Sequence, residues 1–415
     1  MHKLLYKSET QSNKRAMRGG AYFVHRCVFA AGERFPVLMG REGFPVSLPT
    51  RFIIDRVRDR RQANTIEAKV RAIGFLYQWA ASIDTPVDLE SRLRADRPFT
   101  RSEVTSFCRF LRAYRVHDVI PFEWKAVRPA EKTGVLGNNT FNIYLANVVE
   151  FVIWAAETQS SPSLGQNEAR KLQRLFESEK LSATPPRKLF GLDAGQQKEL
   201  LRIVHPDASD NPFNMPVRQR NHLIVQILLE TGIRRGELCK LRVEDVQTKG
   251  DADAFIEVVR RPDDRWDPRQ NEPAVKTRGR RIPISNELKG LVLGYLQRFR
   301  GRVKHPYLFT DPSTGEPIGS LVLNKITAQI QKRCQAMEEA KLTPHALRRT
   351  FNGNVWERSK LLGWDEGKIK RITNYLNGWT ETSQQSAIYQ RKQIEQDAFD
   401  LLTVIQAQAS AKGHL

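Results

Sequence analysis

The chain has 415 residues, which is enough for two domains. Lysine and arginine total 67 against 46 acidic residues, so the formal net charge is +21, divided as +10 up to Pro185 and +11 after it. Such a charge favours a polyanionic partner, and nucleic acid is the usual one. The four cysteines form no Cys-x-x-Cys pair, no apolar run is long enough to cross a membrane, and no nucleotide- or metal-binding motif occurs. The sequence therefore predicts a cytoplasmic protein with no cofactor, no metal and no membrane segment.

Residues 1–57 are predicted to form a strand-containing extension. Two short β-rich runs, 22–29 and 35–39, are separated by glycine and charged residues and are followed by further glycine and proline breaks. The extension hints at extra contacts with DNA or with another subunit.

Residues 58–181 are predicted to form a bundle of four or five helices. Apolar side chains recur with a helical period in the stretches 66–76 and 141–152. Thr100 and Glu103 have the spacing of a capping box, which predicts that a helix begins there. The aromatic residues on these stripes are expected in the core.

A basic, proline-bearing linker is predicted at 182–188, and a second domain at 189–415. In the second domain, helices alternate with three strand-like runs, and a polar insertion at 263–273 lengthens the connection between the last two. The predicted strands are 241–246, 254–260 and 280–284. The predicted fold class is mainly α with a small β-sheet (α+β).

A possible anion site begins at Thr343. Thr343 suits the helix N-cap and Pro344 the first helical position, so His345 and Arg348 would share one face near the helix start. A helix N-terminus favours anions, and the Arg and His side chains could bind a phosphate and move its protons. A pair of polar residues at this spacing is more often only a solvated helix face.

Further motifs surround this pair in a fixed order. They are Thr231-Gly232-Ile233-Arg234, the Lys276 segment, Gly378-Trp379, and Tyr389 ten residues after Trp379. Together they resemble the tyrosine recombinase (phage integrase) family over residues 191–391. The resemblance implies a two-domain DNA clamp, made of a helical core-binding domain and an integrase-type catalytic domain. It also implies a site-specific recombinase or integrase of a mobile element that cuts and rejoins DNA through a 3′-phosphotyrosine.

The resemblance gives four of these residues a catalytic role. Tyr389 is expected to be the nucleophile, and Arg234 and Arg348 to bind the non-bridging phosphate oxygens, for which the planar guanidinium fork is suited. Lys276 is expected to be the general acid for the leaving 5′-oxygen, on a mobile β-hairpin. Three neighbouring basic residues leave the assignment of the lysine open: Lys249, Arg278 and Arg280.

Other site residues have supporting roles. His345 would take the phenolic proton or donate to the phosphorane. Trp379 stands where the family more often has histidine, and its indole offers one N–H donor but no base. Glu237 is expected to orient a catalytic group. Arg235 and Arg349 are interpreted as surface residues or contacts to the DNA backbone.

The expected partners are double-stranded DNA at recombination sites and three further copies of the chain, as a homotetramer associated with the nucleoid. Residues 393–408 carry an apolar stripe that could dock on a neighbouring subunit or pack in its own domain. Two alternatives remain: a type IB topoisomerase-like enzyme, and a DNA-binding protein on the integrase scaffold that has lost catalysis.

Overall fold

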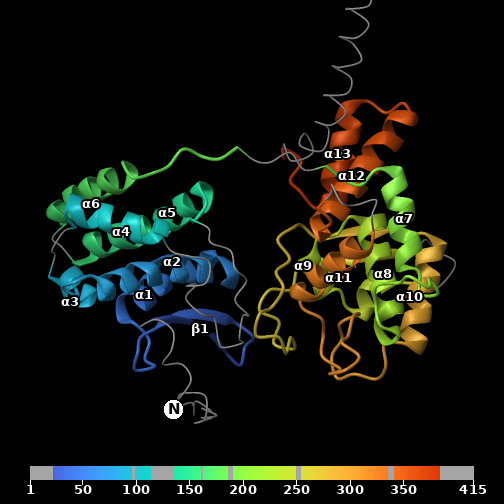
Figure 1. The fold of residues 1–415 in the computed structure, drawn as a ribbon, viewed down its shortest axis with the longest axis horizontal. Coiled ribbons are helices and arrows are strands. Elements are labelled where there is room, and N and C mark those ends of the chain that lie inside the picture. The colour runs from blue at the N-terminus through green and yellow to red at the C-terminus, as the bar shows by residue number, and fades with distance from the viewer. Residues whose placement is uncertain are drawn as a thin grey trace, which may run out of the picture. The chain divides into compact units, whose positions relative to one another are not determined.

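The structure is a computed structural model, and the residues that it describes are 22–95, 99–113, 135–159, 162–185, 190–248, 254–334 and 341–383. The chain divides into two compact units, Met1–Pro186 and Arg187–Leu415. Most described residues are helical and the sheets are small, so the predicted fold class is confirmed (Figure 1). Within the described ranges, no helix is long and apolar enough to cross a membrane.

The first unit combines a β-hairpin with a helical bundle. A π-helical turn, Ile53–Val57, and a 3-10 turn, Arg58–Arg60, connect its first two helices. The strands and helices are β1 Phe23–Val28, β2 Arg34–Met39, α1 Ser47–Phe52, α2 Ala63–Ser82, α3 Leu89–Arg94, α4 Arg101–Ala113, α5 Asn138–Gln159 and α6 Pro162–Glu177.

The hairpin is part of the same hydrophobic core as the helices. β1 and β2 pair antiparallel from Phe23 opposite Met39 to Val28 opposite Arg34. Val24 and Leu38 are fully buried and pack in one cluster with residues of α2 and α5. In Figure 1 the hairpin accordingly lies beside α1 and α2. The two strands that the sequence predicted are confirmed.

The helix start predicted at Thr100 is also confirmed. The Thr100 backbone N–H donates to the Glu103 carboxylate at 2.8 Å, and the Glu103 N–H donates to the Thr100 hydroxyl at 3.3 Å. These reciprocal bonds satisfy two N–H groups that lack partners within α4.

The first unit holds the chain as far as Thr184. Side-chain amides of Asn139 and Asn142 on α5 each exchange a pair of hydrogen bonds with the backbone, at Thr184 and Leu181 respectively. The second unit holds the chain again at Phe190, whose carbonyl accepts a bond from Arg349 at 3.1 Å. The first residues of the predicted linker are therefore fixed to α5.

The second unit is a helical domain with one antiparallel sheet of strand order β3-β4-β5. Its elements are α7 Ala194–Val204, α8 Met215–Thr231, α9 Arg235–Lys240, β3 Val246–Gln247, β4 Phe255–Val258, β5 Arg280–Pro283, α10 Asn286–Arg298, α11 Ser320–Arg333, α12 Pro344–Leu361 and α13 Glu366–Asn377.

The strand predicted at 241–246 is largely wrong. A 3-10 turn, Val243–Asp245, occupies half of it, and only Val246–Gln247 pair with β4. The turn forms because the Asp245 carboxylate accepts a bond from the Arg242 backbone N–H at 2.9 Å. Such local side-chain capping competes with the sheet for backbone groups.

Candidate active site

The N-terminus of α12 positions two of the predicted residues. The Thr343 hydroxyl accepts a bond from the Ala346 N–H at 3.0 Å, and Pro344 occupies the first turn, so the predicted cap is confirmed. From this start His345 is exposed, whereas Arg348 is only 1% exposed. The two side chains therefore begin on neighbouring turns but lie in different environments.

Arg348 is fixed by backbone carbonyls. Its guanidinium donates to the carbonyl of Gly232, the left-handed residue that ends α8, and to the carbonyl of Asn377 at 3.1 Å. The ring of Trp379 lies 5.4 Å from the guanidinium carbon, in a cation–π contact. Trp379 thus packs on a predicted catalytic arginine.

Arg234 also reaches the Asn377 carbonyl. It follows the end of α8 by three residues and donates to the Asn377 oxygen at 3.2 Å. Its side chain remains 32% exposed, so it is more accessible than Arg348. The two arginines predicted to bind phosphate therefore converge on one backbone oxygen at the C-terminal end of α13, where the helix dipole favours cations.

A buried pair of amides holds that carbonyl in place. Asn377 is fully buried, and its side chain exchanges hydrogen bonds with Asn352 on α12 and donates to the Thr373 carbonyl at 2.8 Å. Asn352 in turn donates to the Arg348 carbonyl at 2.8 Å. Sequence reasoning missed both asparagines, and the one available signal was that Asn352 lies four residues after Arg348, on the same helix face.

Gly378 lets the lysine-bearing segment approach α13. Gly378 has φ +63°, and a Cβ there would lie 2.8 Å from the Thr277 Cβ and 2.9 Å from the Arg278 oxygen. The Arg278 N–H donates to the Gly378 carbonyl at 3.1 Å. A glycine is therefore required both by the backbone conformation and by the close approach.

Glu237 links Arg234 to the segment that carries Lys276. The residue is 3% exposed, and its carboxylate accepts bonds from the Arg234 N–H at 2.9 Å, from Arg280 at 2.9 Å, and from the Thr277 hydroxyl. Burial acts to raise the pKa of this carboxyl, but Arg280 and the hydrogen bonds hold it below its ordinary value. The contacts of Glu237 thus favour its charged form.

Lys276 is exposed between two buried neighbours, Val275 and Thr277. The flanking Arg280 is 5% exposed, pairs with Glu237 and donates to the Leu376 carbonyl at 2.6 Å. Arg280 therefore serves the structure of the site, and Lys276 and Arg278 are the exposed candidates for the general acid. Lys249, the other alternative, lies outside the described residues.

His345 sits among cations. Partial burial of its ring, and then the charges of Arg349, Arg348, Arg234 and Arg235, lower its pKa below the ordinary value. The imidazole is therefore neutral at neutral pH and able to accept a proton. Arg235, predicted as a surface residue, is exposed and donates to Asn324 at 3.4 Å.

The predicted nucleophile Tyr389 and the apolar stripe of 393–408 lie outside the described residues. The described part of the site thus brings together Arg234, Glu237, Arg348 and Trp379, with Lys276 one residue from the Glu237 contact. Among the residues that the structure places, no cluster of three acidic, histidine or cysteine side chains could hold a metal ion.

Comparison with known proteins identifies this unit. Residues 192–392 match the model of the phage integrase family, which is the family that the motifs of this region resemble. Transposase A from transposon Tn554 of Staphylococcus aureus is 27% identical over 175 residues, which are 40% of this chain and 45% of that protein. The chain thus matches less than half the length of this relative.

One solved structure is similar enough in fold to compare. The XerH site-specific recombinase bound to palindromic difH substrate is 16% identical, with a TM-score of 0.51 over 85% of this chain and 84% of that one. The Tn1549 transposon integrase in complex with transposon right-end DNA is 17% identical, with a TM-score of 0.48 over 83% and 94%. At this identity the XerH likeness concerns the fold alone.

Proposed function

We propose that this protein is a site-specific DNA recombinase that cuts and rejoins double-stranded DNA through a 3′-phosphotyrosine, in the service of a mobile element. The observation that carries the proposal is the convergence of Arg234 and Arg348 on the Asn377 carbonyl, with His345 three residues before Arg348 and Lys276 next to the Thr277–Glu237 contact. The Tn554 transposase relative supports the mobile-element role.

The proposed reaction is a transesterification. The Tyr389 oxygen attacks the scissile phosphorus while the bond to the 5′-oxygen breaks, and His345 takes the phenolic proton. The leaving 5′-oxygen takes a proton from Lys276. Arg234 and Arg348 stabilise the charge of the phosphorane, a contribution that is large in a partly buried site. The phosphotyrosine keeps the energy of the bond, so that reversal of these steps rejoins a strand.

A nicked suicide substrate tests the nucleophile. After cleavage the short fragment diffuses away, so the covalent complex accumulates and survives denaturation. We expect this adduct with the unaltered protein and its loss with Tyr389→Phe. The matched control is Tyr375→Phe, because Tyr375 is 55% exposed on α13 and donates only to the Arg281 carbonyl. An adduct that persists in Tyr389→Phe would show that another residue is the nucleophile.

The functional assembly is proposed to be a homotetramer on two DNA sites, in the cytoplasm and associated with the nucleoid. The competing type IB topoisomerase-like activity would relax a supercoiled plasmid as a monomer, and a non-catalytic DNA-binding protein would form no adduct. Sedimentation of the protein with and without its DNA site, together with plasmid relaxation, separates these three functions. Relaxation by a species that stays monomeric on DNA would favour the topoisomerase.

A further inference from the structure

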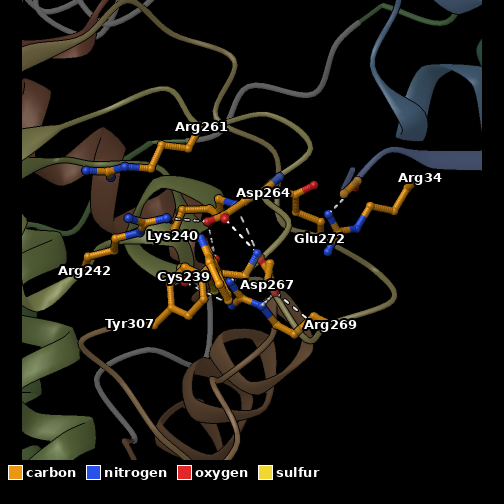
Figure 2. A network of polar contacts seen from close by, with 12 residues as sticks. Arg34, Cys239, Lys240, Arg242, Arg261, Asp264, Asp267, Arg269, Glu272 and Tyr307 are labelled. Carbon is orange, nitrogen blue, oxygen red and sulfur yellow. Dashed lines mark hydrogen bonds and ion pairs between the residues drawn. The ribbon is translucent and has the colours of Figure 1, made fainter. Parts of the chain in front are cut away.

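The connection between β4 and β5, residues 259–279, carries Lys276 and contains the polar insertion that the sequence predicted. It does not form a simple hairpin tip. Figure 2 shows that side chains of this connection turn back onto the end of α9, where they surround Lys240.

Lys240 is the centre of a buried cluster of charges. Its side chain is 2% exposed, and its ammonium lies 3.7 Å from the Asp264 carboxylate, 3.4 Å from that of Asp267, and in contact with that of Glu272. All three carboxylates belong to the connection, whereas Lys240 is the last residue of α9. We call these four residues the Lys240 cluster.

Two arginines balance the remaining charge of the Lys240 cluster. Arg242 donates to Asp264 at 2.7 Å, and Arg269 donates to Asp267 at 2.8 Å. Three cations thus face the three carboxylates, as buried charges require, and Arg242 also pairs with the exposed Glu244 at 3.0 Å.

Hydrogen bonds to neutral groups also fix the connection to the same surface. The Tyr307 hydroxyl donates to Asp264 at 2.7 Å, and Arg269 donates to the Ile318 carbonyl at 2.6 Å. A Cβ on Gly236 of α9 would lie 2.4 Å from the Ala274 oxygen, so the connection touches α9 only two residues before Lys276. The segment is therefore held on both sides of the lysine, because Thr277 donates to Glu237.

Stability alone is a poor explanation for such a cluster. Burying ions costs so much desolvation free energy that well-packed apolar residues often serve stability equally well. What an ion cluster supplies in addition is one defined geometry, since each charge accepts only particular partners. That property is useful at a position that must hold a reacting group in register.

We infer that the Lys240 cluster is a positioning device that fixes the segment bearing Lys276 on α9, so that the ammonium is presented to the leaving 5′-oxygen. The inference rests on the proposed role of Lys276 as general acid. The residues of the Lys240 cluster are positioning residues, because they act through Lys276 and not on the DNA. Detaching the segment would displace Lys276, and misplacement by about 1 Å costs a catalytic group up to about 10²-fold in rate.

The test uses a substrate that needs no general acid. In one DNA the scissile phosphate has its normal 5′-bridging oxygen, and in the other that atom is sulfur. A thiolate leaves without a proton because thiols ionise near pH 8.5, far below alcohols. Loss of proton donation therefore slows cleavage of the oxygen substrate and spares the sulfur substrate.

Glu272→Gln is the informative variant, because it removes one charge of the cluster, keeps the shape, and lies four residues before Lys276. We expect cleavage of the oxygen substrate to fall by roughly 10- to 10²-fold, while cleavage of the sulfur substrate stays near that of the unaltered protein. Arg202→Ala is the matched control, since it breaks an exposed ion pair with Glu199 in the same unit. It should change neither rate.

Lys276→Ala makes the two possible failures distinguishable. If that variant is slow on both substrates, the proposed role of Lys276 is wrong and the inference falls with it. If sulfur rescues Lys276→Ala but Glu272→Gln is slow on both substrates or on neither, the cluster has only a structural role and the inference is overturned. Should Glu272→Gln fail to fold, Tyr307→Phe removes one hydrogen bond to Asp264 and is read in the same way.

Discussion

Replacing Glu237 with alanine separates its electrostatic role from simple packing. Glu237 and Arg280 are each about 1% exposed at their side chains, and their charged atoms lie 2.9 Å apart. Removal of the carboxylate leaves the Arg280 guanidinium buried without its counter-charge and leaves the Arg234 N–H without its acceptor. Breaking a buried ion pair in this way costs about 3–5 kcal/mol of the free energy of unfolding.

Urea unfolding at neutral pH measures this cost. The matched control is Glu199→Ala, whose exposed pair with Arg202 at 2.7 Å should contribute less than about 1 kcal/mol. A double variant, Glu237→Ala with Arg280→Met, removes both charges and should be more stable than Glu237→Ala alone. If the double variant is instead as unstable as the sum of the two single variants, the destabilisation does not come from the uncompensated charge.

The pH dependence of the free energy of unfolding tests the charge of Glu237 independently. The folded protein holds the pKa of Glu237 below its ordinary value, despite the opposing effect of burial, so the charged form contributes stability at neutral pH. That contribution is present above the unfolded pKa of about 4.3 and is lost as pH falls through the folded value. The difference in stability between the unaltered protein and Glu237→Gln should therefore narrow in acid. A difference that stays constant would contradict the assignment.

Three further results are expected. The folded state lowers the pKa of His345, as it does for His222 and His305, so the free energy of unfolding should decline as pH falls below about 6.5, where the unfolded chain takes up protons. His345→Gln should make that decline shallower, as measured by urea midpoints at each pH. Gly378→Ala should lower both stability and the cleavage rate more than Gly363→Ala does. Both glycines have positive φ, but of the two only Gly378 has neighbours within 3 Å of a new Cβ. Equal losses in the two variants would show that the collision does not matter. DNA affinity should fall by roughly 10³–10⁵-fold between about 50 and 200 mM salt if six to ten phosphates are contacted. The second unit alone should bind DNA more weakly than the full chain, since the positive charge is shared between both halves. Equal affinity of the second unit and the full chain in a titration would contradict the shared contact.

Local features of the sequence predicted most of the elements. The helical period in 66–76, the capping residues Thr100 and Glu103, and the cap at Thr343 all act through neighbours within one or two turns. Each could therefore be predicted without knowledge of the fold. The motif order from Arg234 to Tyr389 likewise indicated the family whose model matches residues 192–392, because that order depends on residue type and spacing alone.

The strand predicted at 241–246 shows where local pattern was insufficient. Alternating Leu241 and Val243 suggested a strand, but the Asp245 carboxylate caps a 3-10 turn, and the Leu241 carbonyl accepts a backbone bond from the Leu308 N–H at 2.8 Å instead. Two weak local preferences competed, and contacts more than sixty residues away favoured one of them.

The structure of the site was decided by tertiary contacts. Sequence reasoning treated Arg234 and Arg348 as equivalent, whereas the fold buries Arg348 and leaves Arg234 a third exposed. It could not foresee that both reach the Asn377 carbonyl, since the Arg234 bond joins residues 143 positions apart. The sequence also showed that the insertion between β4 and β5 is polar, but not that its carboxylates surround the buried Lys240. A charged residue in a sequence carries no mark of whether water or an opposite charge will surround it, because that depends on which distant segment the folded chain brings beside it.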